Sequence, residues 1–285
     1  MSSETAAIPI PAITGWPETE RRRVEFVLTD IDDTLTLHGR LPAVAYAAME
    51  RLAAAGLKVI PITGRPAGWC DHIARMWPVE GVVGENGAFW FRHDLTQRRL
   101  VRRFLVDDAT RRASRVRLEA LATRILAEVP GCALASDQLY READLAIDFC
   151  EDVAPLATSD VDRIVALFEE AGCTAKVSSI HVNGWFGRYD KLTMTRILLR
   201  EVFAVELDEA LDRFVFVGDS PNDQPMFAHF PNSVGVANLS RFLNSLATPP
   251  RWLTGPEGGH GFAQVADLLL ATRPGSATAP RLPAR

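Results

Sequence analysis

The segment at residues 24–35 most constrains what this chain can fold into, because an apolar run ends there in three aspartates. Residues 26–28 are typical of a strand that is buried on both faces. Asp30 then lies where this strand ends, with Asp32 and Asp33 just beyond it. Ligands of open parallel sheets bind outside the carboxyl ends of the strands, and neighbouring acids repel one another unless a cation lies between them. The segment therefore indicates a divalent-cation site, and the alternative is a plain acidic turn.

The composition describes a globular protein that can bury a core and excludes several classes of partner. The chain has 285 residues, of which 47% are hydrophobic, and a net charge of −5, which argues against nucleic acid as a partner. Its four cysteines are widely separated, which favours reduced thiols over a zinc site. The sequence has neither an apolar run of about 18 residues, as a membrane span needs, nor a signal-peptide pattern. We therefore expect a cytoplasmic protein without a membrane partner; its oligomeric state cannot be read from the sequence.

Strands and helices alternate at both ends of the chain, which indicates an α/β fold. After the first strand we expect a helix, a strand, a helix and a strand, and the same alternation resumes near residue 191. The expected helices are 42–55, 67–77, 191–202 and 224–229, and the expected strands are 57–62, 82–83, 213–217 and 233–236. The predicted fold class is therefore α/β, with a doubly wound, mainly parallel, Rossmann-like core.

A different pattern interrupts this alternation in the middle of the chain. The elements expected there are a hairpin at 89–104 turning near 93–94, a helix at 109–129, strands at 133–140 and 145–149, a helix at 159–171 capped by Ser159, and strands within 174–186. Helix, strand and strand thus occur twice, which predicts a separate α+β unit. The predicted domains are a discontinuous core at 21–104 and 187–272, an inserted cap at 105–186, and flexible tails at 1–20 and 273–285.

Polar signatures follow three of the expected core strands, and they would meet at one edge of a parallel sheet. These signatures are D-I-D-D-T-L, I-T-G-R-P and V-G-D-S-P-N-D, and a lysine opens the helix at 191. The residues expected at this edge are Asp30, Asp32, Thr63, Lys191, Asp219 and Asp223. Carboxylates, a hard cation, a lysine and a hydroxyl are the groups that phosphoryl transfer needs.

With these motifs, the chain resembles the haloacid dehalogenase superfamily phosphatases of the Cof-like branch, subfamily IIB. Sucrose-phosphate, trehalose-phosphate and mannosyl-3-phosphoglycerate phosphatases are similar. The resemblance extends over residues 26–265 and includes the branch's E-N-G-A at 85–88 and a G-x-G-F-A segment at 259–263. The link at 183–190 departs from the branch, because it lacks the usual proline and small residues. That departure leaves the cap hinge and the substrate class open.

The resemblance implies a mechanism and a metal. Asp30 would be the nucleophile that forms an aspartyl-phosphate, and Asp32 the general acid and then the general base. Asp30, the backbone carbonyl of Asp32, and Asp219 would hold Mg²⁺. Thr34 would stabilise the turn after the nucleophile, and Asp223 would position the lysine or a metal-bound water. The residues implied to bind the substrate phosphate are Thr63, Gly64, Lys191 and Asn222.

The substrate class stays open within this family. We expect a small-molecule phosphate ester, such as a sugar phosphate, with Arg65, Asn86 and Arg141 as candidate specificity residues. Instead of contacting the substrate, Arg65 would pair with a carboxylate near the site. The alternative for Arg141 is a solvent-exposed arginine at a strand end. The alternative functions are a sugar phosphomutase and a non-catalytic regulator that binds phosphate.

Overall fold

The computed structural model describes residues 10–273, and these belong to two compact units that interleave along the chain. The first unit consists of the chain up to Pro61, Trp77–Glu80 and the chain from Ala204 onward, and the second of Ile62–Met76 and Gly81–Phe203. The second unit contains the whole of the predicted cap and extends beyond it on both sides, so the cap limits stay a prediction. No helix within 10–273 is long and apolar enough to cross a membrane.

The first unit is built on a sheet whose strand pairs are all parallel. Its order is β12-β11-β10-β1-β2. The strands are β1 (Phe26–Thr29), β2 (Lys58–Pro61), β10 (Phe214–Gly218), β11 (Ser233–Gly235) and β12 (Trp252–Leu253). β1 and β10 are buried along their whole length, as continuous apolar runs predict. This sheet confirms the predicted fold class.

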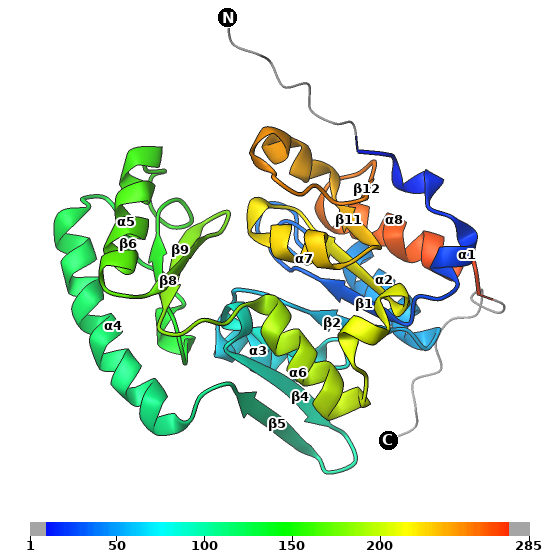
Figure 1. Cartoon of the computed structure of the whole chain (residues 1–285), viewed down its shortest axis with the longest axis horizontal. Helices are drawn as coiled ribbons and strands as arrows, with labels where there is room; N and C mark the ends of the chain where they lie inside the picture. The colour runs from blue at the N-terminus through cyan, green and yellow to red at the C-terminus, as the bar shows by residue number, and fades with distance from the viewer. Residues whose placement is uncertain (1–9, 274–285) are drawn as a thin grey trace, which may run out of the picture. The chain divides into compact units, whose positions relative to one another are not determined.

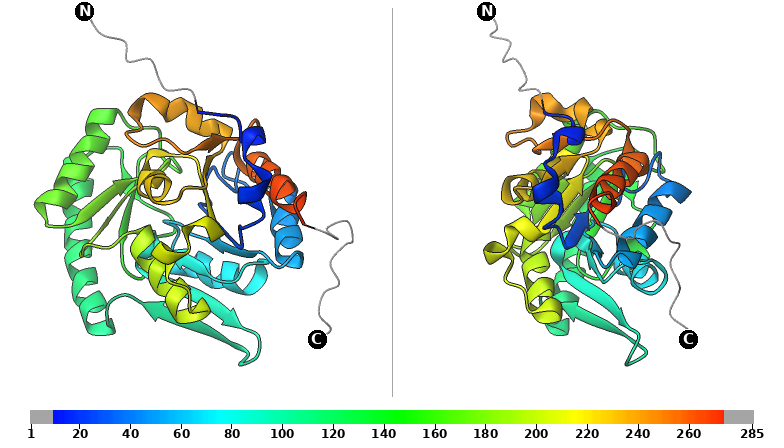
Figure 2. Two further views of the ribbon diagram at one scale, coloured as in Figure 1. Left: turned by 45° about the vertical axis from the view of Figure 1, so that its right-hand side comes forward. Right: turned by 90° about the vertical axis from the view of Figure 1, so that its right-hand side faces the viewer.

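Helices lie on both faces of this sheet, because right-handed crossovers in opposite directions along a sheet fall on opposite faces. The connection from β1 to β2 runs through α2 (Ala43–Ala54), and the one from β10 to β11 runs the other way through α7 (Gln224–His229). α2 packs against α8 (Gly258–Leu270), and the two lie side by side in Figure 2.

Helix α8 is absent from the predicted elements, and its glycines explain both the omission and its position. Gly258 has a φ of +49°, and a Cβ atom there would lie 2.4 Å from the carbonyl oxygen of Thr36. A Cβ atom on Gly259 would lie 2.5 Å from the carbonyl oxygen of Leu35. Glycine disfavours a helix in the sequence, but here it lets the helix begin against the segment that follows β1.

The N-terminal segment at residues 11–20 packs into the first unit, so the predicted flexible tail is wrong for this stretch. Ala12 forms a parallel bridge with Leu253, and the side chains of Ile13 and Trp16 are buried. A 3-10 turn (Ile13–Gly15) and the short helix α1 (Glu18–Arg21) follow. Residues 1–9 and 274–285, where the remaining tail predictions fall, lie outside the described residues.

The second unit begins with a helix, α3 (Ala67–Met76), which a three-stranded antiparallel sheet follows. Its strands are β3 (Val82–Gly84), β4 (Phe89–Asp94) and β5 (Arg99–Phe104), and the other helix of this part is α6 (Lys191–Phe203). The hairpin turns at 95–98 and not at 93–94, because β4 continues through both residues of the predicted turn. Ile62 also bridges Val83 in parallel, which ties the segment before α3 to β3.

The rest of the second unit is an antiparallel sheet of order β6-β7-β9-β8 with two helices on one face (Figure 1). Its elements are α4 (Asp108–Glu128), β6 (Ala133–Leu134), β7 (Leu145–Asp148), α5 (Thr158–Glu170), β8 (Thr174–Val177) and β9 (His181–Trp185). This order confirms the predicted repeat of helix, strand and strand.

Two local predictions in this region are wrong. The strand expected at 133–140 ends at Leu134, and its last part forms the 3-10 turn Gln138–Tyr140. The helix expected to be capped by Ser159 begins one residue earlier, with Ala157 at the N-cap and no side-chain cap. In contrast, α4 is capped by Asp107, whose carboxylate accepts the N–H of Thr110.

Candidate functional site

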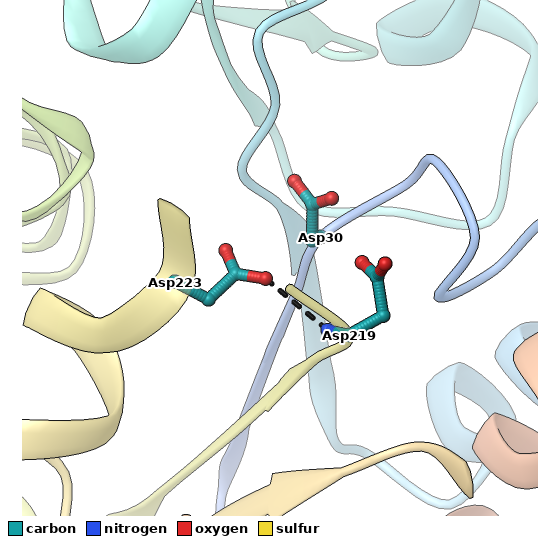
Figure 3. Close-up of side chains that lie close together, drawn as sticks. All are labelled: Asp30, Asp219 and Asp223. Carbon is teal, nitrogen blue, oxygen red and sulfur yellow. Dashed lines mark hydrogen bonds between the residues drawn. The ribbon is translucent and has the colours of Figure 1, made fainter. Parts of the chain in front are cut away.

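Three buried aspartates, here called the aspartate cluster, gather where β1 and β10 end (Figure 3). Asp30 directly follows β1, Asp219 directly follows β10, and Asp223 ends the 3-10 turn after it. Their carboxylate oxygens lie within 4.8 Å of one another, and the residues are 5%, 3% and 0% exposed. The parallel pairing of Thr29 with Val217 places the two strand ends side by side. The structure thus brings together these three predicted residues.

Hydrogen bonds fix the geometry of the aspartate cluster. The Asp223 carboxylate accepts the backbone N–H of Asp219 at 3.2 Å, and the Thr34 hydroxyl donates to Asp219 Oδ1 at 2.9 Å. Gly218 makes this close approach possible, since a Cβ atom there would lie 2.5 Å from Asp223 Oδ2. Thr34 was expected to stabilise the turn after Asp30, and its backbone N–H donates to the Ile31 carbonyl there at 3.3 Å. Its hydroxyl also orients Asp219.

Burial and mutual repulsion make this cluster a candidate cation site. Burial raises the pKa of Asp219 well above its usual value, and Asp223 and Asp30 raise it further. A bound cation would reverse this effect by favouring the ionised carboxylates. Close-set carboxylate oxygens are the donors that Mg²⁺ prefers, so the donor set fits this ion. Asp223, which the resemblance places outside the metal ligands, also offers a carboxylate oxygen within 4.8 Å of the other two.

The turn between Asp32 and Asp33 is held from the far end of the chain. Asp33 has a φ of +55°, and its N–H donates to the Thr36 hydroxyl at 2.8 Å. Asn238 donates to the Asp33 carbonyl at 2.8 Å and accepts the N–H of Gly258 at 3.0 Å. Sequence reasoning missed Asn238, because nothing in its local pattern shows that it reaches a turn more than 200 residues away. Asp32 is half-buried and lies outside the aspartate cluster.

In the second unit, backbone bonds hold the loop that begins at Thr63. Thr63 is fully buried, and its hydroxyl accepts the N–H of Arg65 at 3.0 Å. Its N–H donates to the Val83 carbonyl, and its carbonyl accepts the N–H of Asn86. A Cβ atom on Gly64 would lie 3.2 Å from the Asn86 amide, so Asn86 packs closely against this loop. Asn86 was expected among the specificity residues, and this packing gives it a structural contact as well.

The start of α6 lies against the loop that contains Asn86. Lys191 is the first residue of this helix and is buried. Gly87 has a φ of +106°, and a Cβ atom there would lie 2.1 Å from the Asp190 carbonyl oxygen. Only glycine permits this approach, so the E-N-G-A motif fixes the position of Lys191. In the first unit, Asn222 is half-buried and accepts the Ser220 hydroxyl at 2.7 Å.

Arg141 lies in a buried network, here called the arginine cluster, with Asp137 and Asp144. Its side chain is 1% exposed and pairs with Asp137 at 3.1 Å and with Asp144 at 3.0 Å. The alternative of a solvated arginine is therefore wrong. The expected contact with an anionic or hydroxyl-rich part of the substrate stays a prediction, and the guanidinium also donates to the Gly64 carbonyl.

The Arg65 side chain contacts two carboxylates and an aromatic ring of the second unit, as expected if it pairs with a carboxylate. Its guanidinium lies 3.4 Å from an Asp137 oxygen and 3.2 Å from a Glu151 oxygen. It also lies over the Trp69 ring, 4.5 Å from the centroid. The second acceptor, Glu151, pairs with His181 at 2.8 Å. The pKa of Glu151 is lowered to about 2, chiefly by the adjacent His181 imidazole and also by Arg65.

Comparisons with known proteins identify the fold, although neither a family model nor a curated protein matches the sequence. A Thermoplasma acidophilum protein has a TM-score of 0.65 at 18% identity, over 86% of this chain and 98% of its own. The sucrose-phosphatase from Synechocystis sp. PCC6803, solved with sucrose and phosphate, has a TM-score of 0.60 at 15% identity, over 87% of this chain and 98% of the phosphatase. A sugar phosphatase described as HAD subclass IIB has a TM-score of 0.56 at 15% identity, over 82% of this chain and 94% of its own. These similarities confirm the predicted fold.

Proposed function

We propose that this chain, which has the fold of the haloacid dehalogenase phosphatases, hydrolyses a small phosphorylated metabolite in a Mg²⁺-dependent reaction. The observation that carries the proposal is the aspartate cluster, in which Asp30 directly follows a central strand and shares its surroundings with Asp219 and Asp223. Like-charged carboxylates held this close destabilise a fold, so we infer that they are kept for a bound cation and for chemistry.

In the proposed first step, a carboxylate oxygen of Asp30 attacks phosphorus, and the bond from phosphorus to the substrate oxygen breaks. Asp32 donates a proton to the departing oxygen, so an alcohol leaves and an aspartyl-phosphate remains. Asp32 lies outside the aspartate cluster and is only half-buried, which suits a carboxyl that must carry a proton. Mg²⁺, bound by Asp30, Asp219 and the Asp32 carbonyl, would supply charge neutralisation for the phosphoryl group.

In the proposed second step, Asp32 is ionised and accepts a proton from water. The hydroxide oxygen bonds to phosphorus, the bond from phosphorus to the Asp30 oxygen breaks, and inorganic phosphate leaves. The carboxylate of Asp30 is thereby restored. Asp223 accepts the N–H of Asp219, so it holds the loop that carries this residue, and we propose this positioning as its role.

We further propose that the phosphoryl oxygens are bound by Thr63, Gly64, Lys191 and Asn222. The support for Thr63 is its hydrogen bonding: its hydroxyl oxygen accepts the N–H of Arg65, and the hydroxyl keeps one hydrogen that it can donate to a phosphoryl oxygen. The support for Lys191 is its fixed place at the start of α6, which Gly87 makes possible.

The substrate that we propose is a sugar phosphate. The support is the similarity in fold to a sucrose-phosphatase solved with sucrose and phosphate and to a subclass IIB sugar phosphatase. Residues 105–186 would form the cap that selects the substrate and excludes water. A cytoplasmic location, in keeping with the composition, is part of the same proposal.

The experiment that tests the proposed function measures phosphate release from an aryl phosphate with and without Mg²⁺. We expect release only with the metal, and a panel of phosphorylated sugars and glycerates then ranks substrates by kcat/KM. Phosphate that moves to a second position on the sugar, with no free phosphate, would indicate a phosphomutase. Tight phosphate binding without turnover of any ester would indicate a regulator, and either result would overturn the proposal.

A further inference from the structure

The guanidinium of Arg141 makes an unusual set of bonds, because it reaches a backbone carbonyl as well as two carboxylates. Nε and Nη2 both donate to Asp137 Oδ1 at 3.1 Å, and Nη1 donates to both Asp144 oxygens at 3.0 and 3.1 Å. The same Nη1 donates to the carbonyl oxygen of Gly64 at 3.0 Å. Bidentate pairing fixes the plane of a guanidinium, so the donor to Gly64 is held in place.

The Gly64 carbonyl belongs to the same peptide unit as the N–H that reaches Thr63. A peptide unit is planar, so the C=O of Gly64 and the N–H of Arg65 turn together. That N–H donates to the Thr63 hydroxyl oxygen at 3.0 Å. A charged donor on the carbonyl also polarises the peptide and strengthens the bond that its N–H donates. Arg141 is thus connected to the Thr63 hydroxyl through one rigid group, although 78 positions separate them in the sequence.

Glu85 holds the backbone around Arg141 from the other side. Its buried carboxylate accepts the N–H groups of Glu142, Ala143 and Asp144, the closest at 2.6 Å. It also accepts the N–H of Ala67 at 2.9 Å, at the start of α3. One carboxylate therefore fastens the segment that carries Arg141 to the helix that follows the Thr63 loop.

We propose that Arg141 is a positioning residue, which orients the Thr63 hydroxyl for a phosphoryl group through the peptide between Gly64 and Arg65. This inference rests on the proposed function, in which Thr63 binds phosphate. It replaces the direct substrate contact expected from the sequence with an indirect one. It also explains why Asp137 and Asp144 both pair with Arg141, because the two together fix the direction of its third contact.

A double-mutant cycle distinguishes positioning from a general structural role. The variants are Arg141→Lys, Thr63→Val and the double variant, all with Mg²⁺ and an aryl phosphate. A lysine keeps the charge but cannot fork between Asp137, Asp144 and the Gly64 carbonyl. The matched control is Asn183→Ala, which removes a hydrogen bond to Asp144 and leaves the Arg141 contacts in place.

If Arg141 acts through Thr63, the two substitutions are not additive. We expect Thr63→Val to lower kcat/KM about 10²-fold, Arg141→Lys to lower it roughly tenfold, and the double variant to match Thr63→Val within about twofold. The inhibition constant of inorganic phosphate should rise in both single variants, whereas the Mg²⁺ concentration for half-activation should not change. Asn183→Ala should change kcat/KM by less than about twofold.

Several outcomes would overturn the inference. One is that Arg141→Lys lowers kcat/KM by the same factor in the wild-type protein and in Thr63→Val. Another is a phosphate inhibition constant that Arg141→Lys leaves unchanged. If Arg141→Lys does not fold, by circular dichroism and melting, Asp137→Asn replaces it, because it weakens the pairing of Nε and Nη2 that fixes the plane of the guanidinium. The same criteria apply.

The test separates this inference from the proposed function. If the wild-type protein hydrolyses phosphate esters but the cycle is additive, only the positioning role fails. If the wild-type protein releases no phosphate from any ester, the proposed function fails. Calorimetric titration with inorganic phosphate then decides about positioning: weaker binding by both Arg141→Lys and Thr63→Val supports it, and unchanged binding by Arg141→Lys overturns it.

Discussion

The aspartate cluster of the first unit and the arginine cluster of the second both bury charged side chains. The first contains charges of one sign, whereas the second contains charges of both signs. In the first, Asp30, Asp219 and Asp223 share one sign, and burial and repulsion raise the pKa of Asp219. In the second, Arg141 lies between Asp137 and Asp144 and pairs with both. Carboxylates of one sign destabilise the fold unless a cation binds between them. In a paired network, removing one member leaves its partner as an uncompensated buried charge. Substitutions in the two clusters should therefore affect activity and stability differently.

The largest effect that we expect is the loss of activity in Asp30→Asn. The amide has the same shape but cannot attack phosphorus, so kcat should fall by at least about 10⁴-fold. The free energy of unfolding should not fall, because one of three repelling charges is removed. Phosphate release and chemical denaturation measure the two quantities. Asp33→Asn, the same change three residues away and outside the aspartate cluster, is the control and should keep most activity.

In the arginine cluster, the largest effect should be on stability. Arg141→Met leaves Asp137 and Asp144 buried without this partner, so we expect a loss of about 3–5 kcal/mol in the free energy of unfolding. The matched control is Arg124→Met, since Arg124 pairs with Glu128 and Glu170 on the surface. Removing that exposed arginine should cost less than about 1 kcal/mol. Equal losses in urea denaturation would contradict the distinction between buried and exposed pairs.

Mg²⁺ should stabilise the aspartate cluster and leave the arginine cluster unaffected. A ligand that binds only the folded state adds about 2.7 kcal/mol at a hundred times its Kd. The melting temperature of the wild-type protein should therefore rise with Mg²⁺, and Asp219→Asn should lose most of this rise. Thermal melts in increasing Mg²⁺ measure the effect. A rise of the same size in Asp219→Asn would place the bound metal elsewhere.

The smallest effect concerns Glu151, whose pKa is lowered to about 2 because His181 and Arg65 favour its ionised form. A carboxyl whose pKa is lowered in the folded state stabilises the fold at pH values above its ordinary pKa of 4.5. This contribution disappears as the pH falls towards 2. Glu151→Gln should therefore cost on the order of 1–2 kcal/mol at neutral pH, after allowing for partial exposure. The difference from wild type should shrink between pH 4.5 and 2, with the exposed Glu119→Gln as control. A difference that does not change with pH would contradict the ion pairs.

The aspartate cluster could be predicted from the sequence because its geometry follows from local patterns. A continuous apolar run predicts a buried strand, and parallel strands bring Asp30 and Asp219 to one edge. Asn238 could not be predicted, because its contact with the turn after Asp30 depends on how α8 folds back.

The arginine cluster could not be predicted, because its contacts join distant segments. An arginine at the end of an expected strand is usually exposed, and nothing near Arg141 in the sequence indicates the Gly64 carbonyl as its partner. The apolar residues after 133 suggested a strand as far as 140. Instead the chain turns at Leu134, and this turn brings Asp137 to the guanidinium.

The most direct test of the account is phosphate release by the wild-type protein after removal of divalent cations with a chelator. The account predicts that release stops, that added Mg²⁺ restores it, and that Ca²⁺ inhibits, because its looser coordination would misplace the attacking oxygen. Full activity in excess chelator would contradict the central claim that the aspartate cluster works with a bound cation.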